Sequence, residues 1–177
     1  AGGSVTIGSA NSKNSNALQV ITDEQINGDL TVTNYDDESG KNNAILVSKS
    51  LQAAGDVILI NEEAAITVNS GAALACYDVA LGAKTAMTIN GSVNATRDAS
   101  LSSGAGMTIN GNVSATRDAS LKSSAGMSII GDVTAGNDAS LTAGQDFIQN
   151  AGTIAASDVA ITAQRNVLLN GGSMAAN

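Results

Sequence analysis

The chain has 177 residues, of which 16 are acidic and 8 are basic, so its formal net charge is -8. This balance argues against a nucleic-acid partner, because contacts to phosphate need a basic face. Hydrophobic residues make up 43% of the chain, but aromatic residues make up only 2%. The core must therefore be narrow and built from small and medium aliphatic side chains.

Residues 1–49 form the least regular part of the chain. Short apolar runs predict strands near residues 5–7, 17–21, 30–32 and 44–47. The polar stretch 34–43 (NYDDESGKNN) predicts a loop that leaves the strands, and loops often carry binding function. Its acidic side chains could ligate a cation, but a solvated acidic loop is the preferred interpretation. The candidate partner-contacting residues are Asn34, Tyr35, Asp36, Asp37 and Glu38.

Three blocks of twenty residues follow one another at 87–106, 107–126 and 127–146. The first reads MTINGSVNATRDASLSSGAG, and the other two are close copies of it. Apolar and polar residues alternate in two short runs within each block, which is the pattern of a half-buried strand and not of a helix. Turn-forming pairs such as Asn-Gly separate the runs. Repetition at a fixed period indicates a repeat architecture.

Equivalent residues recur every 20 positions along this region. An all-β fold, the parallel β-helix (β-solenoid) with about 20 residues per coil, explains this period, because each coil would stack on the last at about 4.8 Å. We expect about nine such coils, irregular over 1–49 and regular over 50–177, in one continuous solenoid cut from a longer protein. The predicted structural ladder comprises Asp78, Asp98, Asp118, Asp138, Asp158, Leu81, Leu101, Leu121, Leu141 and Ile161.

Two departures from the period are expected to be absorbed at corners. The segment from Asn69 to Asp78 has one residue more than its counterpart from Asn90 to Asp98. Ile154 also lies one place later than Val133 predicts. Because solenoids tolerate insertions in their loops, we expect the strand register to continue unchanged on both sides of each insertion.

The aspartate column suggests two kinds of chemistry. In the first, each carboxylate accepts a backbone N–H at its own corner, as in an Asx turn, while Arg97 and Arg117 offset the charge. The second is a calcium column, but the glycine-rich nonapeptide of calcium-binding solenoids is absent. The first interpretation is preferred, and Cys76 is interpreted as a small apolar side chain.

An enzyme is the remaining alternative, in the form of a carbohydrate-active β-helix. Paired catalytic carboxylates should be unique and not copied in every coil. The chain also has no His, so triad chemistry lacks its base. We therefore expect a protein that is not an enzyme and has no catalytic residues, no cofactor and no metal site.

Three segments resemble the repeats of the filamentous haemagglutinin family of two-partner secretion exoproteins. They are AGDVILIN (54–61), INGNVSATRDASLKSSAGMSI (109–129) and LTAGQDFIQNAGTIAASDVAITAQRNVLLNGGS (141–173). The resemblance implies a right-handed β-helix that is secreted to, or stands on, the surface of a Gram-negative bacterium. The family includes adhesins, haemolysins and contact-dependent growth-inhibition toxins. Its secretion domain carries Asn-Pro motifs, and this chain has no Pro, so we expect an internal segment.

The resemblance also implies a function and partners. We expect a structural shaft that presents binding or toxin regions away from the cell. The implied partners are an outer-membrane two-partner transporter during export, and a receptor or glycan on a host or neighbouring cell. A receptor- or glycan-binding module acting through loop 34–43 is the alternative function, and a carbohydrate-active enzyme is a weaker one.

Overall fold

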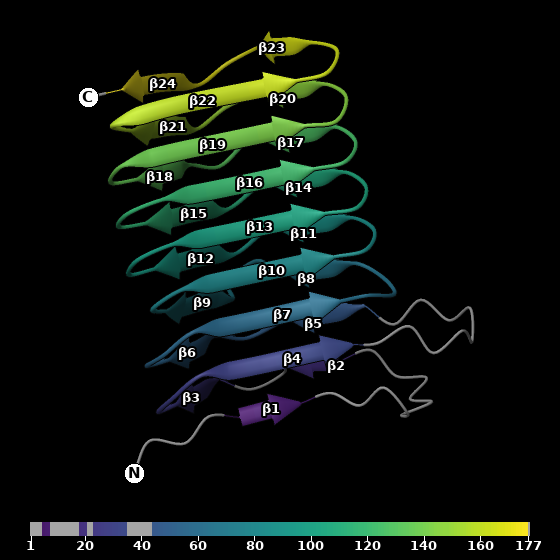
Figure 1. The fold of residues 1–177 in the computed structure, drawn as a ribbon, viewed down its shortest axis with the longest axis vertical. Coiled ribbons are helices and arrows are strands. Elements are labelled where there is room, and N and C mark those ends of the chain that lie inside the picture. Colours follow the sequence, from purple (N-terminus) through teal and green to yellow (C-terminus); the bar gives the residue numbers. More distant parts are fainter. Residues whose placement is uncertain (1–4, 8–17, 21–22, 35–43, 177) are drawn as a thin grey trace.

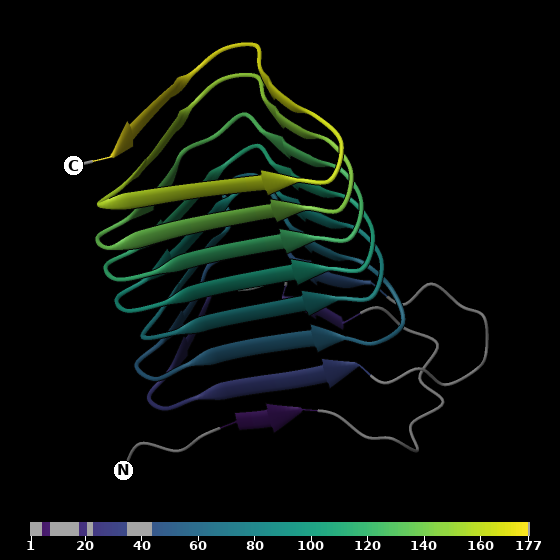
Figure 2. The same ribbon diagram turned by 45° about the horizontal axis from the view of Figure 1, so that its top comes forward.

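The computed structural model is a right-handed parallel β-helix, which confirms the predicted fold class. It describes residues 5–7, 18–20, 23–34 and 44–176. Three sheets, each of eight parallel strands, surround one apolar core (Figure 1). Figure 2 shows the triangular path of each coil and the right-handed rise of the chain. The described residues form strands and connections only, so none of them belongs to a helix that could cross a membrane.

Each coil contributes one strand to each of three sheets, which we call A, B and C. Sheet A contains β1 (Val5–Ile7), β4 (Leu30–Asn34), β7 (Val57–Asn61), β10 (Val79–Ala83), β13 (Ala99–Ser103), β16 (Ala119–Ser123), β19 (Asp138–Ala143) and β22 (Asp158–Ala163). Sheet B contains β2 (Leu18–Val20), β5 (Ile45–Val47), β8 (Ile66–Val68), β11 (Met87–Ile89), β14 (Met107–Ile109), β17 (Met127–Ile129), β20 (Phe147–Gln149) and β23 (Val167–Leu169). Sheet C contains β3 (Glu24–Ile26), β6 (Leu51–Ala53), β9 (Ala73–Cys76), β12 (Ser92–Ala95), β15 (Asn112–Ala115), β18 (Val133–Ala135), β21 (Thr153–Ala156) and β24 (Ser173–Ala176).

The length of a coil changes along the chain. In sheet A, Leu30 pairs with Val57, 27 residues later, and Val57 pairs with Val79, 22 residues later. From the pairing of Val79 with Ala99 onward, the spacing stays at 20. The expectation of nine coils was therefore too high, because the first coils are longer and each sheet has eight strands.

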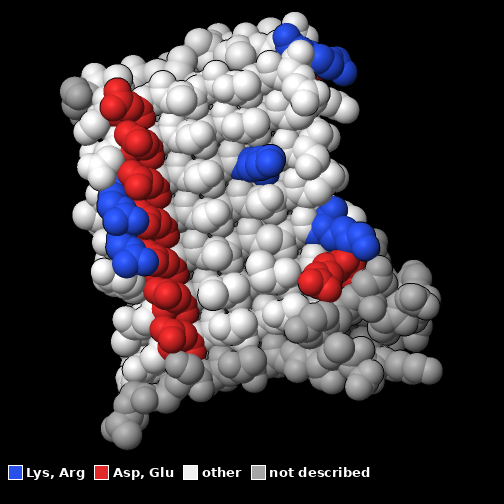
Figure 3. Space-filling view, viewed as in Figure 1, with Lys and Arg blue, Asp and Glu red and all other residues white. Residues whose placement is uncertain are grey.

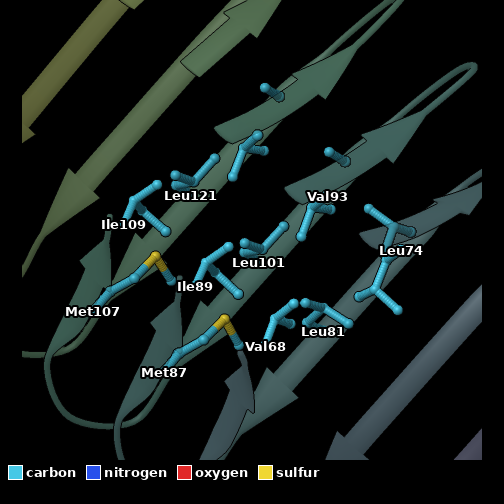
Figure 4. Close-up of a cluster of buried hydrophobic side chains, with 14 of the residues drawn as sticks. Val68, Leu74, Leu81, Met87, Ile89, Val93, Leu101, Met107, Ile109 and Leu121 are labelled. Atoms are coloured by element: carbon cyan, nitrogen blue, oxygen red, sulfur yellow. The ribbon is translucent and has the colours of Figure 1, made fainter. Parts of the chain in front are cut away.

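The core consists of apolar side chains stacked in columns, one residue per coil in each column. Leu81, Leu101, Leu121 and Leu141 lie in register in sheet A, and all of them are buried. Figure 4 shows how leucines of sheet A meet isoleucines and methionines of sheet B and valines of sheet C. Burying such a side chain contributes roughly 1.5–3 kcal/mol. The alternation in the sequence thus becomes an apolar inner face, because side chains in a strand point alternately to its two sides.

The extra residue after Asn69 is absorbed by two corners and not by one. Ile66 pairs with Met87 in sheet B, 21 positions later, whereas Leu74 pairs with Val93 in sheet C, only 19 positions later. The corner from sheet B to sheet C is thus longer in this coil, and the following corner, from C to A, is shorter. Gly71 turns the longer corner with a φ of 82°, which glycine adopts without steric cost.

The second departure is resolved in the same way. Val133 pairs with Ile154, while Ala139 still pairs with Val159 at a spacing of 20. The sheet B to sheet C corner is again lengthened, and here Gly152 has a positive φ of 72°. The register continues unchanged beyond both insertions, and in each case the corner from sheet C to sheet A that follows the long corner is one residue shorter than in the neighbouring coil.

Candidate functional site

A column of aspartates runs along the corner between sheets C and A, immediately before the strands of sheet A. Figure 3 shows it as a continuous acidic stripe along one side of the solenoid. Backbone hydrogen bonds from coil to coil extend it beyond the predicted residues, to Asp29 and Asp56. The members are Asp29, Asp56, Asp78, Asp98, Asp118, Asp138 and Asp158.

Five of the seven carboxylates, from Asp29 to Asp118, accept a backbone N–H from the coil that follows. The backbone N–H of Asp98 donates to Oδ1 of Asp78 at 3.0 Å, and the N–H of Asp118 donates to Oδ1 of Asp98 at 3.3 Å. The same bond joins Asp138 to Asp118 at 3.3 Å and Asp56 to Asp29 at 2.9 Å. These bonds link neighbouring coils, so the expectation of a local Asx turn was wrong. The column connects one coil to the next.

Two arginines lie between stacked carboxylates in the middle of the column. Arg97 donates through Nε to Oδ1 of Asp78 at 2.8 Å and through a second nitrogen to Oδ2, and its Nε lies 3.6 Å from Asp98. Arg117 binds Asp98 in the same way and lies 3.4 Å from Asp118. Each guanidinium therefore bridges two coils, which offsets the repulsion between carboxylates stacked one coil apart.

This arrangement shifts the pKa values of its members. The side-chain hydrogen bond from Arg117 lowers the pKa of Asp98, and the backbone N–H of Asp118 acts in the same direction. The pKa of Arg97 is raised by its hydrogen bond to Asp78, and that of Arg117 by its bond to Asp98. The guanidinium of Arg97 also lies 4.6 Å from the ring centroid of Tyr77, a distance that allows a cation–π contact.

We expect acid to destabilise the solenoid partly through Asp98. Its pKa is lowered in the folded state, so its contribution to stability is complete above the unfolded pKa of about 3.9. That contribution is lost as the pH falls through the folded pKa. Thermal melts between neutral pH and pH 3 should therefore show a shallower acid slope for Asp98→Asn than for the parent. Because Arg165 pairs with Asp146 elsewhere, Arg165→Gln should keep the parent slope, and equal slopes for the parent and Asp98→Asn would contradict the assignment.

Arginines precede the aspartates only in the middle of the column. Asn137 precedes Asp138 and Ser157 precedes Asp158, at the places where Arg97 and Arg117 precede their aspartates. The backbone N–H of Asn137 still donates to Arg117 O at 2.8 Å. The upper part of the column therefore keeps the coil-to-coil backbone geometry without the guanidinium groups.

Cys76 is buried next to this column. Its thiol donates to the carbonyl of Asp78 at 3.1 Å, and only 5% of the residue is exposed. Burial raises the pKa of the thiol to about 11. The thiol therefore stays protonated at neutral pH and behaves as a small apolar side chain, in the same column as Ala95.

Cys76 should react only when its coil opens. At pH 8 we expect slow modification of the native chain by a thiol reagent, because the reactive thiolate is scarce and the sulfur is buried. Modification in denaturant should be fast, and a free cysteine peptide serves as the reference. A native rate close to that of the peptide would contradict this expectation.

Asparagines form a second set of ladders at other corners. The Asn110 amide donates to Asn90 Oδ1 at 2.7 Å, and that of Asn170 donates to Asn150 Oδ1 at 3.0 Å. Asn34, from the candidate partner loop, takes part in a similar pair, because its amide donates to Asn61 Oδ1 at 3.0 Å. The other loop candidates, Tyr35, Asp36, Asp37 and Glu38, lie outside the described residues.

The sequence carried a signal for the two missed aspartates. The spacing from Asp29 to Asp56 is 27 and that from Asp56 to Asp78 is 22, so a search at a fixed period of 20 does not find them. A local pattern does find them, because every member precedes an apolar, variable, apolar triplet. The pattern reads DLTV at Asp29 and DVIL at Asp56, against DASL at Asp98.

The column does not form a chelating site in the described part of the chain. Each coil supplies a single carboxylate at this corner, and five of the carboxylates accept a backbone N–H. No group of three or more acidic, Cys or His side chains suited to a metal occurs among residues 5–7, 18–20, 23–34 and 44–176.

Comparison with known proteins adds no relative to this description. No family model, no curated protein and no solved structure matches the chain. The functional conclusion therefore depends on the geometry of the solenoid itself.

Proposed function

We propose that the chain is a shaft segment of a secreted filament on the surface of a Gram-negative bacterium, holding binding or toxin regions away from the cell. The observation that carries this proposal is the aspartate column, in which five successive carboxylates each accept a backbone N–H from the next coil. The aspartates, which are repeated on the surface from coil to coil, therefore connect neighbouring coils. Because their hydrogen-bonding groups are used within the solenoid, this surface suits a spacer better than a binding site.

The outer faces of the strands support the same proposal. The outward positions of sheet A in successive coils are Ser100, Ser120 and Ser140, in register and exposed. On the outer face of sheet B, Thr67, Thr88 and Thr108 lie in register and are half-buried. Such small hydroxyl side chains keep the sides of the solenoid polar and similar from coil to coil, whereas binding sites usually combine distinct groups in a concave place.

Removal of one whole coil tests the proposal. Deleting residues 99–118 joins Asp98 to Ala119 in the register of the parent, so the fold should survive and the rod should shorten by about 4.8 Å. Deleting 99–108 removes half a coil and should disrupt the fold, which makes it the matched control. On cells that carry the chain between an outer-membrane anchor and an epitope, the epitope should become less accessible as whole coils are removed.

Other outcomes would favour other functions. If the chain alone bound host cells or glycans saturably, and lost that binding on deletion of 34–43, it would be a binding module. Turnover of an acidic polysaccharide by the chain would favour an enzyme. We expect neither result, and we expect export to require the outer-membrane transporter of a two-partner system.

A further inference from the structure

Tyr77 interrupts the repetition of the surface. It immediately precedes Asp78, at the place where Arg97 and Arg117 precede their aspartates in the next two coils. The three residues are stacked, because the Arg97 N–H donates to Tyr77 O and the Arg117 N–H donates to Arg97 O, both at 2.9 Å. Tyr77 is 46% exposed. A position that carries a cation in two coils therefore carries an exposed aromatic ring in this one.

One face of this ring already holds a guanidinium group. The Cζ atom of Arg97 lies 4.6 Å from the ring centroid, which is within the range of a cation–π contact. The same guanidinium donates through Nε to Oδ1 of Asp78 at 2.8 Å. The structure thus contains an example of a guanidinium held jointly by the Tyr77 ring and by a carboxylate of the aspartate column. Both contacts suit this planar cation, which stacks on rings and matches the geometry of a carboxylate.

The other side of the ring is open in its own column. The Tyr77 N–H donates to Gly55 O at 2.8 Å, and the Gly55 N–H donates to Gly28 O at 3.1 Å, so the two residues below Tyr77 are glycines. A larger residue does not fit at position 55, because an added Cβ would clash with Oδ1 of Asp29. No side chain of this column therefore covers the ring face that is turned away from Arg97.

The carboxylate of Asp56 lies in the coil below Tyr77 and lacks the guanidinium that Asp78 has. Its Oδ1 accepts the N–H of Asp78 at 3.2 Å, and its Oδ2 has no hydrogen-bond partner in the described part of the chain. Asp56 directly follows Gly55, which cannot supply a cation. On the face shown in Figure 3, the acidic stripe continues below the two arginines with no basic side chain beside it. An open aromatic face and an unneutralised carboxylate thus occur in neighbouring coils.

We propose that the open face of Tyr77 and the carboxylate of Asp56 form a docking site for an arginine side chain of a partner protein. The incoming guanidinium stacks on the ring from below, as Arg97 does from above, and offsets the charge of Asp56. Tyrosine and arginine are both enriched in protein interfaces. The proposal goes beyond the shaft function and does not depend on it, because a spacer works with or without a partner at its side.

The arginine must come from a different protein and not from a second copy of this chain. The chain has three arginines, Arg97, Arg117 and Arg165, and each pairs with a carboxylate of its own chain. The net charge of -8 also makes two copies repel each other. A partner with a basic surface is instead attracted to the acidic stripe, and this attraction speeds and orients its approach.

An NMR titration of the full chain with N-acetyl-arginine methylamide tests the site. A Tyr35→Phe background leaves Tyr77 as the only tyrosine, so its ring signals report binding directly. We expect these signals, and the backbone amides of residues 55–56 and 77–78, to shift saturably with a Kd in the millimolar range, since a single exposed cation–π contact is weak. N-acetyl-lysine methylamide should bind less tightly, because an ammonium group is more strongly hydrated and does not stack.

Variants followed through the same backbone amides separate the two halves of the site. Asp56→Asn should weaken binding about threefold, the upper range for an exposed ion pair, and should stay folded because Asn can still accept the Asp78 N–H. Tyr77→Phe should keep the affinity, whereas Tyr77→Leu should lower it about threefold. Asp138→Asn is the matched control and should bind like the parent, because Asp138 is an exposed member of the same column with Asn137 before it in place of an aromatic residue.

Tyr77→Arg should abolish binding without loss of the fold. It removes the ring and supplies a guanidinium to Asp56 from within the chain, at a position that already holds arginine in the next two coils. Circular dichroism melts establish that each variant is folded. Absence of saturable shifts, equal affinity for the lysine probe, unchanged affinity in Asp56→Asn, or an equal loss in Asp138→Asn would each overturn the proposal. Shifts at Tyr77 that grow with the concentration of the chain alone would place a second copy at the site, and would also overturn it.

Discussion

Replacing Leu121 by Asp should open the solenoid at its centre. Leu121 is 1% exposed and stacks between Leu101 and Leu141 in the central column of sheet A. The substitution removes the leucine packing, which contributes about 2–5 kcal/mol, and places a carboxylate where no water reaches it. We therefore expect the free energy of unfolding to fall by about 5 kcal/mol or more. Denaturant titration followed by circular dichroism measures this change.

The neighbouring residue in the same strand provides the control. Ser120 points to the outer face of sheet A and is exposed, so Ser120→Asp should change the stability by no more than about 0.5 kcal/mol. Because each coil contacts only its neighbours, hydrogen exchange in the Leu121→Asp chain should be fastest around β13, β16 and β19. If both variants unfolded at the same denaturant concentration, Leu121 would not lie in the core column.

The core columns could be predicted from the sequence because residues at equivalent positions of successive coils lie above one another in the interior of a solenoid. Once Leu101 and Leu121 are 20 residues apart in matching blocks, one must lie above the other if the coils stack, and the structure pairs them directly. The turns were equally readable, since Asn-Gly pairs occupy the corners after β11 and β14. Local pattern and global fold agree throughout this region, which is typical of a sequence that specifies one structure.

The early coils were less predictable because their length varies. Corner insertions change the spacing from 20 to 22 and 27 without changing which residues face the core. A fixed period therefore misses Asp29 and Asp56, although the triplet that follows each of them is apolar at the right places. The direction of the aspartate hydrogen bonds was also hidden, because a carboxylate can accept an N–H from its own turn or from the next coil. Which of these two N–H groups the carboxylate accepts from depends on the distance between stacked coils, and the sequence does not give that distance.

Three glycines, Gly91, Gly111 and Gly131, stack closely at the corner between sheets B and C, and we call them the glycine column. Gly131 lies directly on the backbone of the coil below, and a Cβ added there would lie 1.8 Å from the carbonyl oxygen of Gly111. The Gly131 N–H also donates to Ile109 O at 3.1 Å. The two coils cannot move apart at this corner without breaking that hydrogen bond, so the clash cannot be relieved locally.

Gly131→Ala should therefore destabilise the chain by about 3 kcal/mol, the upper range for overpacking a closely packed site. Gly126→Ala is the matched control, because its added Cβ would meet nothing closer than the Asp146 carbonyl oxygen at 3.5 Å, an ordinary contact. The control should be neutral, or slightly stabilising through the lower entropy of the unfolded chain. Thermal and denaturant melts of the two variants measure the difference. Equal stability of the two variants would mean that the coils are not stacked as closely at this corner as the structure places them. A loss of stability in Gly131→Ala alone would show that the glycine column, like the aspartate column, sets the distance between coils.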